Sequence, residues 1–147
     1  MEVPMKILIS ACLLGIECKY NGGHNRCEEL MKSTDSFVPI CPEQLAGLPT
    51  PRPPMEIQKD GRVLTVSGED VTEAMNKGAR ESLRIAKLFH CEKAILKACS
   101  PSCGYGEIYD GSFSGKKVSG MGIAAKKLHE FGIEIMTEEN LIKGERL

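Results

Sequence analysis

The chain has 147 residues, a length that predicts a single domain over residues 1–147 with enough volume for a hydrophobic core that needs no disulfide bonds. Nineteen basic against twenty acidic residues give a formal net charge of -1, and no run of like charge suggests a nucleic-acid or membrane surface. Aromatic residues make up 5% of the chain and tryptophan is absent, so the stacking platforms of single-strand binders are missing too. A small-molecule partner fits this composition best.

The apolar stretch "ILISACLLGI" after Lys6 has the look of a short export signal. Only three apolar residues separate Lys6 from Ser10, however, and an export signal needs an apolar stretch of roughly seven to fifteen. The whole stretch is also shorter than the roughly 18 residues of a membrane span. We therefore expect a buried strand over residues 5–10 in a cytoplasmic protein.

Strand and helix patterns alternate along the next part of the chain. A short helix is predicted over residues 26–34, and a second apolar strand over 36–41 is closed by Pro42. Residues 46–70 are rich in proline, and the segment "MEIQKDGRVLTV" within them predicts a small hairpin arm with a tight turn at Asp60-Gly61.

The most regular helical pattern covers residues 71–90, where apolar residues recur at spacings of three and four. The elements predicted after it are a strand over 91–100, a glycine-rich loop or second hairpin over 108–120, a helix over 122–131 ended by Gly132, a strand over 133–137 and a helix over 138–147. This alternation is typical of an α/β fold with a mostly parallel, Rossmann-like sheet and helices on both faces.

Seven cysteines, an odd number, do not fit a complete disulfide framework. Three of them, Cys12, Cys41 and Cys103, follow the ends of three predicted strands. The carboxyl ends of parallel strands meet at one edge of a sheet, so we expect these thiols to converge in one pocket. Small and turn-forming residues surround each of them, which lets backbone amides approach a ligand.

Three thiolates without an evident fourth ligand fit two kinds of site. One is a three-cysteine zinc site with an open position, and the other is an iron–sulfur cluster with one iron not bound by the protein. Glu43, two residues after Cys41, is the candidate acid or base beside such an open position. Its alternative interpretation is an ordinary glutamate at the start of a helix.

Polar residues near these cysteines extend the candidate site. Arg52, inside "TPRPP", can present its guanidinium to a carbonyl or carboxylate of a substrate, or it can be a solvated arginine in a rigid loop. Ser100 and Ser102 flank Pro101, where they can bind substrate or water, or cap the turn.

The remaining thiols are predicted to lie outside the site. We expect Cys99 to be packed within the third large strand and Cys91 to be structural at the far end of that strand. Cys18 and Cys27 flank the loop "KYNGGHN" and are expected to be solvated, with a spare ligand or a redox pair as the alternative. His24 in that loop could ligate a metal.

Six segments of the sequence together resemble the thiouracil desulfidase family of short bacterial and archaeal proteins. They are "SACLLGIECKYNGG", "CPEQLAGLPTPRPPMEI", "GEDVTEAMNKGA", "AILKACSPSCG", "IYDGSFSGKKVSGMG" and "GIEIMTEEN". They keep the family's order and compatible spacing over nearly the whole chain.

The resemblance implies a [4Fe-4S] cluster held by Cys12, Cys41 and Cys103, with the fourth iron open to the sulfur of a thiolated nucleobase such as 2-thiouracil. By similarity the desulfuration is hydrolytic and not redox: water adds to the thiocarbonyl carbon, and uracil and sulfide are released. Glu43 would activate the water or carry its proton, and Ser100 would orient the substrate.

We therefore assign Glu43 and Ser100 to the catalytic set, and Ser10, Arg52 and Ser102 to substrate binding. The main alternative is a carrier that binds and hands on sulfide, iron or zinc through its thiols without converting an organic substrate. A third hypothesis is a stable zinc protein that uses the same three thiolates.

Overall fold

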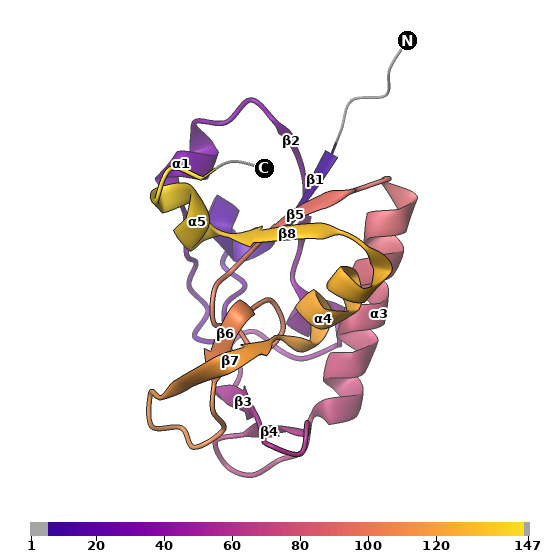
Figure 1. The fold of residues 1–147 in the computed structure, drawn as a ribbon. Helices are drawn as coiled ribbons and strands as arrows, with labels where there is room; N and C mark the ends of the chain where they lie inside the picture. The colour runs from indigo at the N-terminus through magenta and orange to yellow at the C-terminus, as the bar shows by residue number, and fades with distance from the viewer. Residues whose placement is uncertain (1–5, 146–147) are drawn as a thin grey trace.

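The computed structural model describes residues 6–145 and is built on a four-stranded sheet (Figure 1). Its strands are β1 (Lys6–Ser10), β2 (Ser36–Ile40), β5 (Lys93–Leu96) and β8 (Glu134–Thr137), all parallel and in the order β2-β1-β5-β8. This confirms the predicted parallel sheet. The first residue of the predicted first strand, Met5, and residues 146–147 of the predicted last helix lie outside the described residues.

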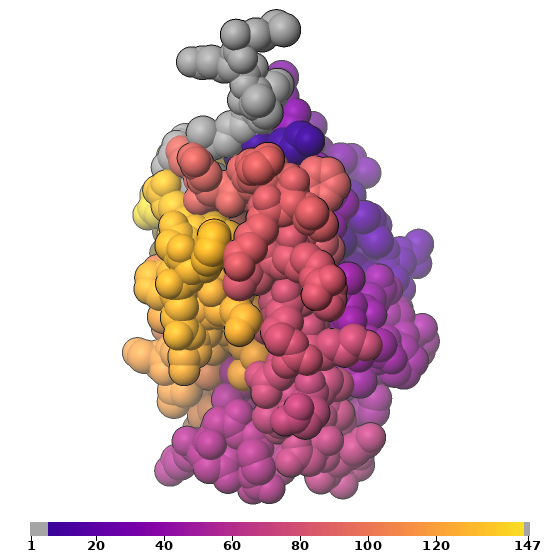
Figure 2. All heavy atoms as spheres, turned by 90° about the vertical axis from the view of Figure 1, so that its right-hand side faces the viewer, coloured from indigo at the N-terminus to yellow at the C-terminus, as the bar shows by residue number. Residues whose placement is uncertain are grey.

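Helices cover both faces of the sheet, as the sequence predicts. One face is covered by α3 (Thr72–Leu88) and α4 (Ile123–Phe131), and the other by the 3₁₀ helix η1 (Ala11–Leu14), α1 (Glu28–Met31) and α5 (Glu138–Ile142). Figure 2 shows the molecule from the side on which the rose-coloured α3 lies. No helix in residues 6–145 is long and apolar enough to cross a membrane.

Both faces of the central strand β1 are buried, which explains its uninterrupted apolar sequence. Ile7 and Ile9 point toward η1, α1 and α5, where they pack with Leu13, Leu30 and Leu141. Leu8 points the other way and packs with Ala86 of α3 and with Ala125 and Leu128 of α4. The two apolar layers hold β1 from both sides, so the residues that follow β1 leave the sheet from a fixed point.

Two antiparallel hairpins lie below the sheet in Figure 1. The first joins β3 (Met55–Ile57) to β4 (Val63–Thr65) and confirms the predicted arm, with Gly61 at a positive φ in the turn. The second joins β6 (Tyr105–Tyr109) to β7 (Lys117–Met121), so the glycine-rich stretch is a hairpin rather than a loop.

The third large strand, β5, is shorter than the predicted 91–100, and side chains explain where it ends. Past Leu96, the Lys97 N–H donates to Ser10 Oγ at 2.9 Å, and the Ala98 N–H donates to Glu138 Oε1 at 2.7 Å. Cys99 then adopts a left-handed φ of 64° and is half-buried. The prediction that Cys99 packs within the strand is therefore wrong.

A close backbone contact fixes the short helix α2 (Pro42–Leu45) at the carboxyl end of β2. Gly78 in the middle of α3 faces this helix, and a Cβ on Gly78 would lie 2.1 Å from Pro42 O. Only glycine allows α2 to approach α3 this closely. The contact therefore sets the position of Cys41 and Glu43 relative to the sheet.

We expect Gly78→Ala to destabilise the protein, although alanine is the better helix former by about 1 kcal/mol. The added Cβ must displace the Pro42 carbonyl, and overpacking of this kind costs about 1–3 kcal/mol. Thermal unfolding measures the effect, with Lys77→Ala on the exposed side of α3 as the control. A Tm of the Gly78 variant at or above that of the control would contradict this account.

Candidate functional site

Three thiols gather at the carboxyl edge of the sheet. Cys12 lies in η1 directly after β1, Cys41 lies between β2 and α2, and Cys103 lies in the turn between β5 and β6. Cys12 and Cys103 are buried, and Cys41 is half-buried. The charge of Cys12 acts on Cys103, and that of Cys41 acts on Cys12, so the three thiols are electrostatic neighbours.

These thiols are not gathered around a single point. No group of three or more histidine, cysteine, aspartate or glutamate side chains within residues 6–145 is arranged to hold a metal ion. A mononuclear zinc site needs all its sulfurs about 2.3 Å from one ion. The ligands of an iron–sulfur cluster bind different irons, so they do not have to meet at one ion.

Glu43 brings a buried carboxylate between these thiols. Its Oε1 accepts a hydrogen bond from Ser102 Oγ, and its Oε2 lies 3.5 Å from Cys41 Sγ and 3.6 Å from Arg52 Nη2. The carboxylate lies in the first turn of α2, where the helix dipole favours a negative charge. It thus joins the segment after β2 to the turn that carries Cys103.

Arg52 is the cation that faces Glu43, and its side chain is only 5% exposed. Nη2 donates to the carbonyl of Cys18 at 3.0 Å, and Nη1 donates to Thr50 Oγ1 at 3.1 Å. Among the residues that the structure describes, Nε is the one buried side-chain nitrogen or oxygen without a hydrogen-bond partner. The interpretation of Arg52 as a solvated arginine is therefore wrong.

The serines of the "SPSC" turn form a chain of hydrogen bonds that ends at Glu43. Ser100 Oγ accepts the backbone N–H groups of Ser102 and Cys103 at 3.2 and 3.1 Å, and it lies 3.1 Å from Ser102 Oγ. Because the Ser102 proton points to Glu43, the Ser100 hydroxyl must donate to Ser102 Oγ. The serines therefore cap the turn and also connect to the carboxylate.

Ser10 holds two parts of the site from the end of β1. Its hydroxyl accepts the Lys97 N–H at 2.9 Å and also forms a hydrogen bond with the Cys103 side chain. Ser10 is buried, so both bonds are protected from water. The hydroxyl therefore fixes the end of β5 and the orientation of one thiol.

Burial makes two of the three thiols poor acids. Loss of solvent raises the pKa of Cys103 and that of Cys12, and a hydrogen bond from Asn25 Nδ2, 3.4 Å from Cys12 Sγ, partly offsets the shift at Cys12. The pKa of Cys41 is instead lowered, because the Cys18 thiol donates a hydrogen bond to its sulfur. Cys41 is thus the site thiol that forms a thiolate most readily.

Asn25 is a site residue that the sequence patterns did not identify, and they offered Cys18 only in the alternative, as a spare ligand or one of a redox pair. Cys18 is only 2% exposed and Cys27 is buried as well, so the expectation that both are solvated is wrong. The chain after η1 folds back over the site, and the Asn25 N–H donates to the Cys12 carbonyl at 2.9 Å. The loop motif "KYNGGHN" marks a turn but does not reveal this contact.

The sequence offers His24 as a possible metal ligand and predicts Cys91 to be a structural thiol outside the site. His24 is exposed, and its Nδ1 accepts the backbone N–H of Arg26 at 3.1 Å, so its ring is used within its own loop. Cys91 is buried in the apolar layer beneath α3 and α4, as expected of a structural thiol.

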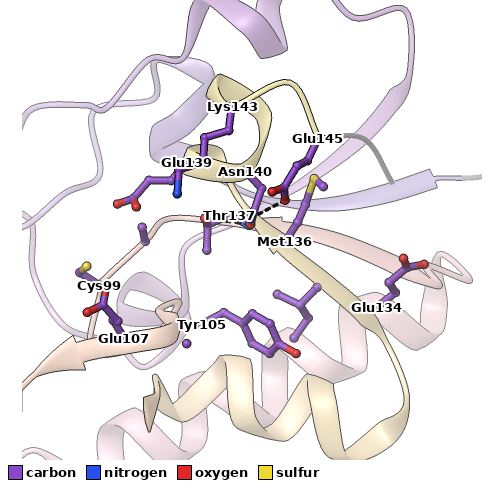
Figure 3. A pocket seen from close by; sticks show the side chains of 13 residues that line it. Cys99, Tyr105, Glu107, Glu134, Met136, Thr137, Glu139, Asn140, Lys143 and Glu145 are labelled. Atoms are coloured by element: carbon purple, nitrogen blue, oxygen red, sulfur yellow. Dashed lines mark hydrogen bonds between the residues drawn. The ribbon is translucent and has the colours of Figure 1, made fainter. Parts of the chain in front are cut away.

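A separate cavity of about 490 Å³ lies beside the edge strand β8 (Figure 3). Residues of β6, β8 and α5 line it, and Asn140 Nδ2 donates to Glu145 there at 2.8 Å. Cys99 borders it, but Cys12, Cys41 and Cys103 do not. This cavity is therefore not the space that the three thiols enclose.

Known proteins match this chain over nearly its whole length. The model of a family described as 2-thiouracil desulfurase matches residues 7–140. A protein of Bacillus subtilis (strain 168) that is called "Uncharacterized protein YbbK" is 44% identical over 146 residues, covering 92% of this chain and 97% of its own. A solved structure of the [4Fe-4S]-dependent thiouracil desulfidase TudS matches with a TM-score of 0.86 at 38% identity, over 95% of this chain and 94% of its own.

In metal-free protein, we expect iodoacetamide to alkylate Cys41 faster than Cys12 or Cys103, because Cys41 is the least buried and its thiolate accepts the hydrogen bond of Cys18. Cys18→Ala removes that donor, so the pKa of Cys41 rises and its alkylation profile moves to higher pH. Cys18→Ser keeps a donor and should stay near the wild-type profile. Peptide mapping by mass spectrometry across a pH series measures this, and an unchanged profile in Cys18→Ala would refute the donor role.

Proposed function

This chain belongs to the 2-thiouracil desulfurase family, and from that premise we propose that it removes the sulfur of a thiolated nucleobase such as 2-thiouracil by hydrolysis. The observation that carries the proposal is the position of Glu43. Its buried carboxylate bonds Ser102 on one side and lies 3.5 Å from Cys41 Sγ on the other. A proton-accepting group thus lies among three thiols that could hold a metal cluster.

Cys12, Cys41 and Cys103 would hold a [4Fe-4S] cluster, a cofactor on which a related enzyme, by its description, depends. Their chemistry fits the group, because all three are free cysteines and thiolates are its usual ligands. Asn25 provides a hydrogen bond to the Cys12 sulfur, and Ser10 provides one to the Cys103 sulfur. When bound, a cluster with one iron free of protein ligands supplies an open Lewis-acidic position for the substrate sulfur.

Glu43 accepts a proton from water in this reaction and then returns it. It takes a proton from the attacking water as the water oxygen bonds to the thiocarbonyl carbon. The same proton can return to the sulfur as the carbon–sulfur bond breaks. The second water proton leaves the new hydroxyl as the uracil carbonyl forms and joins the departing hydrosulfide, so water and thiouracil give uracil and hydrogen sulfide without any electron transfer. Arg52 provides the counter-charge that a buried carboxylate needs, at 3.6 Å from Oε2.

Among the polar residues around Glu43, the serines hold other groups in place, and Arg52 has one N–H group without a hydrogen-bond partner in the described part of the chain. Ser102 orients the carboxylate, and Ser100 extends the hydrogen-bond chain by which a proton could leave it. The Ser10 hydroxyl bonds the Cys103 side chain and the Ser102 hydroxyl bonds Glu43, so both serines hold groups of the site in place. Arg52 Nε has no partner, and it can donate to an oxygen or a ring nitrogen of the nucleobase.

We also propose that the protein works in the cytoplasm. All seven cysteines are free, and free thiols persist where glutathione and thioredoxin keep them reduced. A cluster held by three of them would be assembled in the same compartment.

Protein purified without oxygen should contain about four irons and four sulfides per chain. Alanine at Cys12, Cys41 or Cys103 should remove most of this iron, whereas Cys91→Ala, in the apolar layer away from the site, should retain it. Metal and acid-labile sulfide analysis with an absorption spectrum measures both. Stoichiometric zinc without iron would replace the cluster with a three-thiolate zinc site.

Glu43→Gln should lower sulfide release from 2-thiouracil by about 10²–10⁴-fold while the iron content stays unchanged. Glutamine keeps the size of the side chain and a hydrogen bond to Ser102, but it cannot accept the proton. Glu130→Gln on the exposed side of α4 is the matched control. Full turnover in Glu43→Gln would exclude the proposed base. Wild-type protein that holds the cluster but releases no sulfide from 2-thiouracil would favour a carrier or another substrate.

A further inference from the structure

Lys97 and Glu138 form a largely buried ion pair that the proposed chemistry does not use. Lys97 Nζ lies 3.0 Å from Glu138 Oε2, and the side chains are 30% and 11% exposed. The other carboxylate oxygen of Glu138 accepts the Ala98 N–H at 2.7 Å, and Lys97 Nζ also donates to the Ala98 carbonyl at 3.1 Å. Both charges are therefore held in place by the backbone between them.

The parallel register puts this pair beside the site. Ile9 of β1 pairs with Ile95 of β5, so the residue two positions after Ile95 lies next to the chain that enters η1. The Lys97 N–H donates to Ser10 Oγ, two residues before Cys12. By this register Lys97 lies level with Ala11, the residue before Cys12.

The ammonium of Lys97 is an electrostatic neighbour of Cys12. Burial works against the charge of Lys97, but the carboxylate of Glu138, followed by the charges of Cys12 and Cys99, outweighs burial and raises the Lys97 pKa. In return, Lys97 favours the thiolate of Cys12. Arg52 does the same for Cys41 on the other side of the site.

We propose that Lys97 is a positioning residue whose ammonium, oriented by Glu138, supplies the positive charge on the Cys12 side of the site and stabilises the anionic sulfur that gathers there. This inference rests on the proposed function. The sulfur includes the Cys12 thiolate and the hydrosulfide that a desulfuration releases. Lys97 acts through the site's charge balance and does not itself transfer a proton to the substrate.

A fixed positive charge favours whichever state of a nearby cluster carries more negative charge, which is the reduced state. Removing the charge of Lys97 should therefore make the reduction potential more negative. Removing the charge of Glu138 should make it more positive, because Lys97 then acts unopposed. A purely structural role would not produce shifts of opposite sign.

The test is a potentiometric titration of the cluster-loaded protein under anaerobic conditions. We expect Lys97→Gln to shift the potential negative, Glu138→Gln to shift it positive, and Lys97→Arg to stay near wild type. Lys87→Gln is the matched control, because Lys87 lies at the end of α3, near the start of β5 and the opposite edge of the sheet. If Lys97→Gln does not bind the cluster, the other two variants still test the proposal. The reduction potential should shift positive in Glu138→Gln and stay near wild type in Lys97→Arg.

Two failures are distinguishable. Wild-type protein that never holds iron would overturn the proposed function and the role of Lys97 together. Iron-loaded protein in which Lys97→Gln and Glu138→Gln shift the potential in the same direction, or not at all, would overturn the role of Lys97 alone and leave the desulfidase proposal intact.

Discussion

The site depends on one buried carboxylate. Glu43 joins three parts of the chain that are distant in sequence: α2, the turn after β5 through Ser102, and the proline-rich segment through Arg52. A carboxylate in an apolar interior is unfavourable unless it is hydrogen-bonded and paired. The folded state satisfies that requirement only when all three segments are in place, so completing the Glu43 contacts also brings Cys41 and Cys103 to the same edge of the sheet.

Close contacts between backbone atoms fix the positions of the segments that carry the site residues. A Cβ on Gly122 would lie 2.5–2.8 Å from the backbone of Ser102 and Cys103, just as one on Gly78 would meet Pro42. The start of α4 is thereby seated directly against the main chain of the Cys103 turn, and the start of α2 against the middle of α3. Such contacts leave little room for movement, because interiors are close-packed and backbone cannot rotate away like a side chain. The thiols are consequently carried on segments that are held by helices rather than on free loops.

The sequence predicted the arrangement that depends on topology and missed the arrangement that depends on local contacts. Parallel strands have their carboxyl ends at one edge, so three cysteines after three strands could be brought together from pattern alone. Cys99 could not be placed, because β5 ends where Ser10 and Glu138 bind the next two backbone N–H groups. Cys18 could not be placed either, because its burial follows from how the glycine loop folds back over η1. Neither contact leaves a periodic signal in the sequence.

The distribution of charge separates surface from site. Pairs such as Arg62 with Asp60 and Arg26 with Glu28 are about half exposed, and ion pairs of that kind contribute little to stability. The pairs formed by Arg52 with Glu43 and by Lys97 with Glu138 are largely buried, where desolvation offsets much of the attraction. Stability alone therefore gives little reason for two such pairs in a small core. Each places a cation beside a thiol of the site, at Cys41 and at Cys12, which is where anionic sulfur needs a counter-charge that water cannot provide.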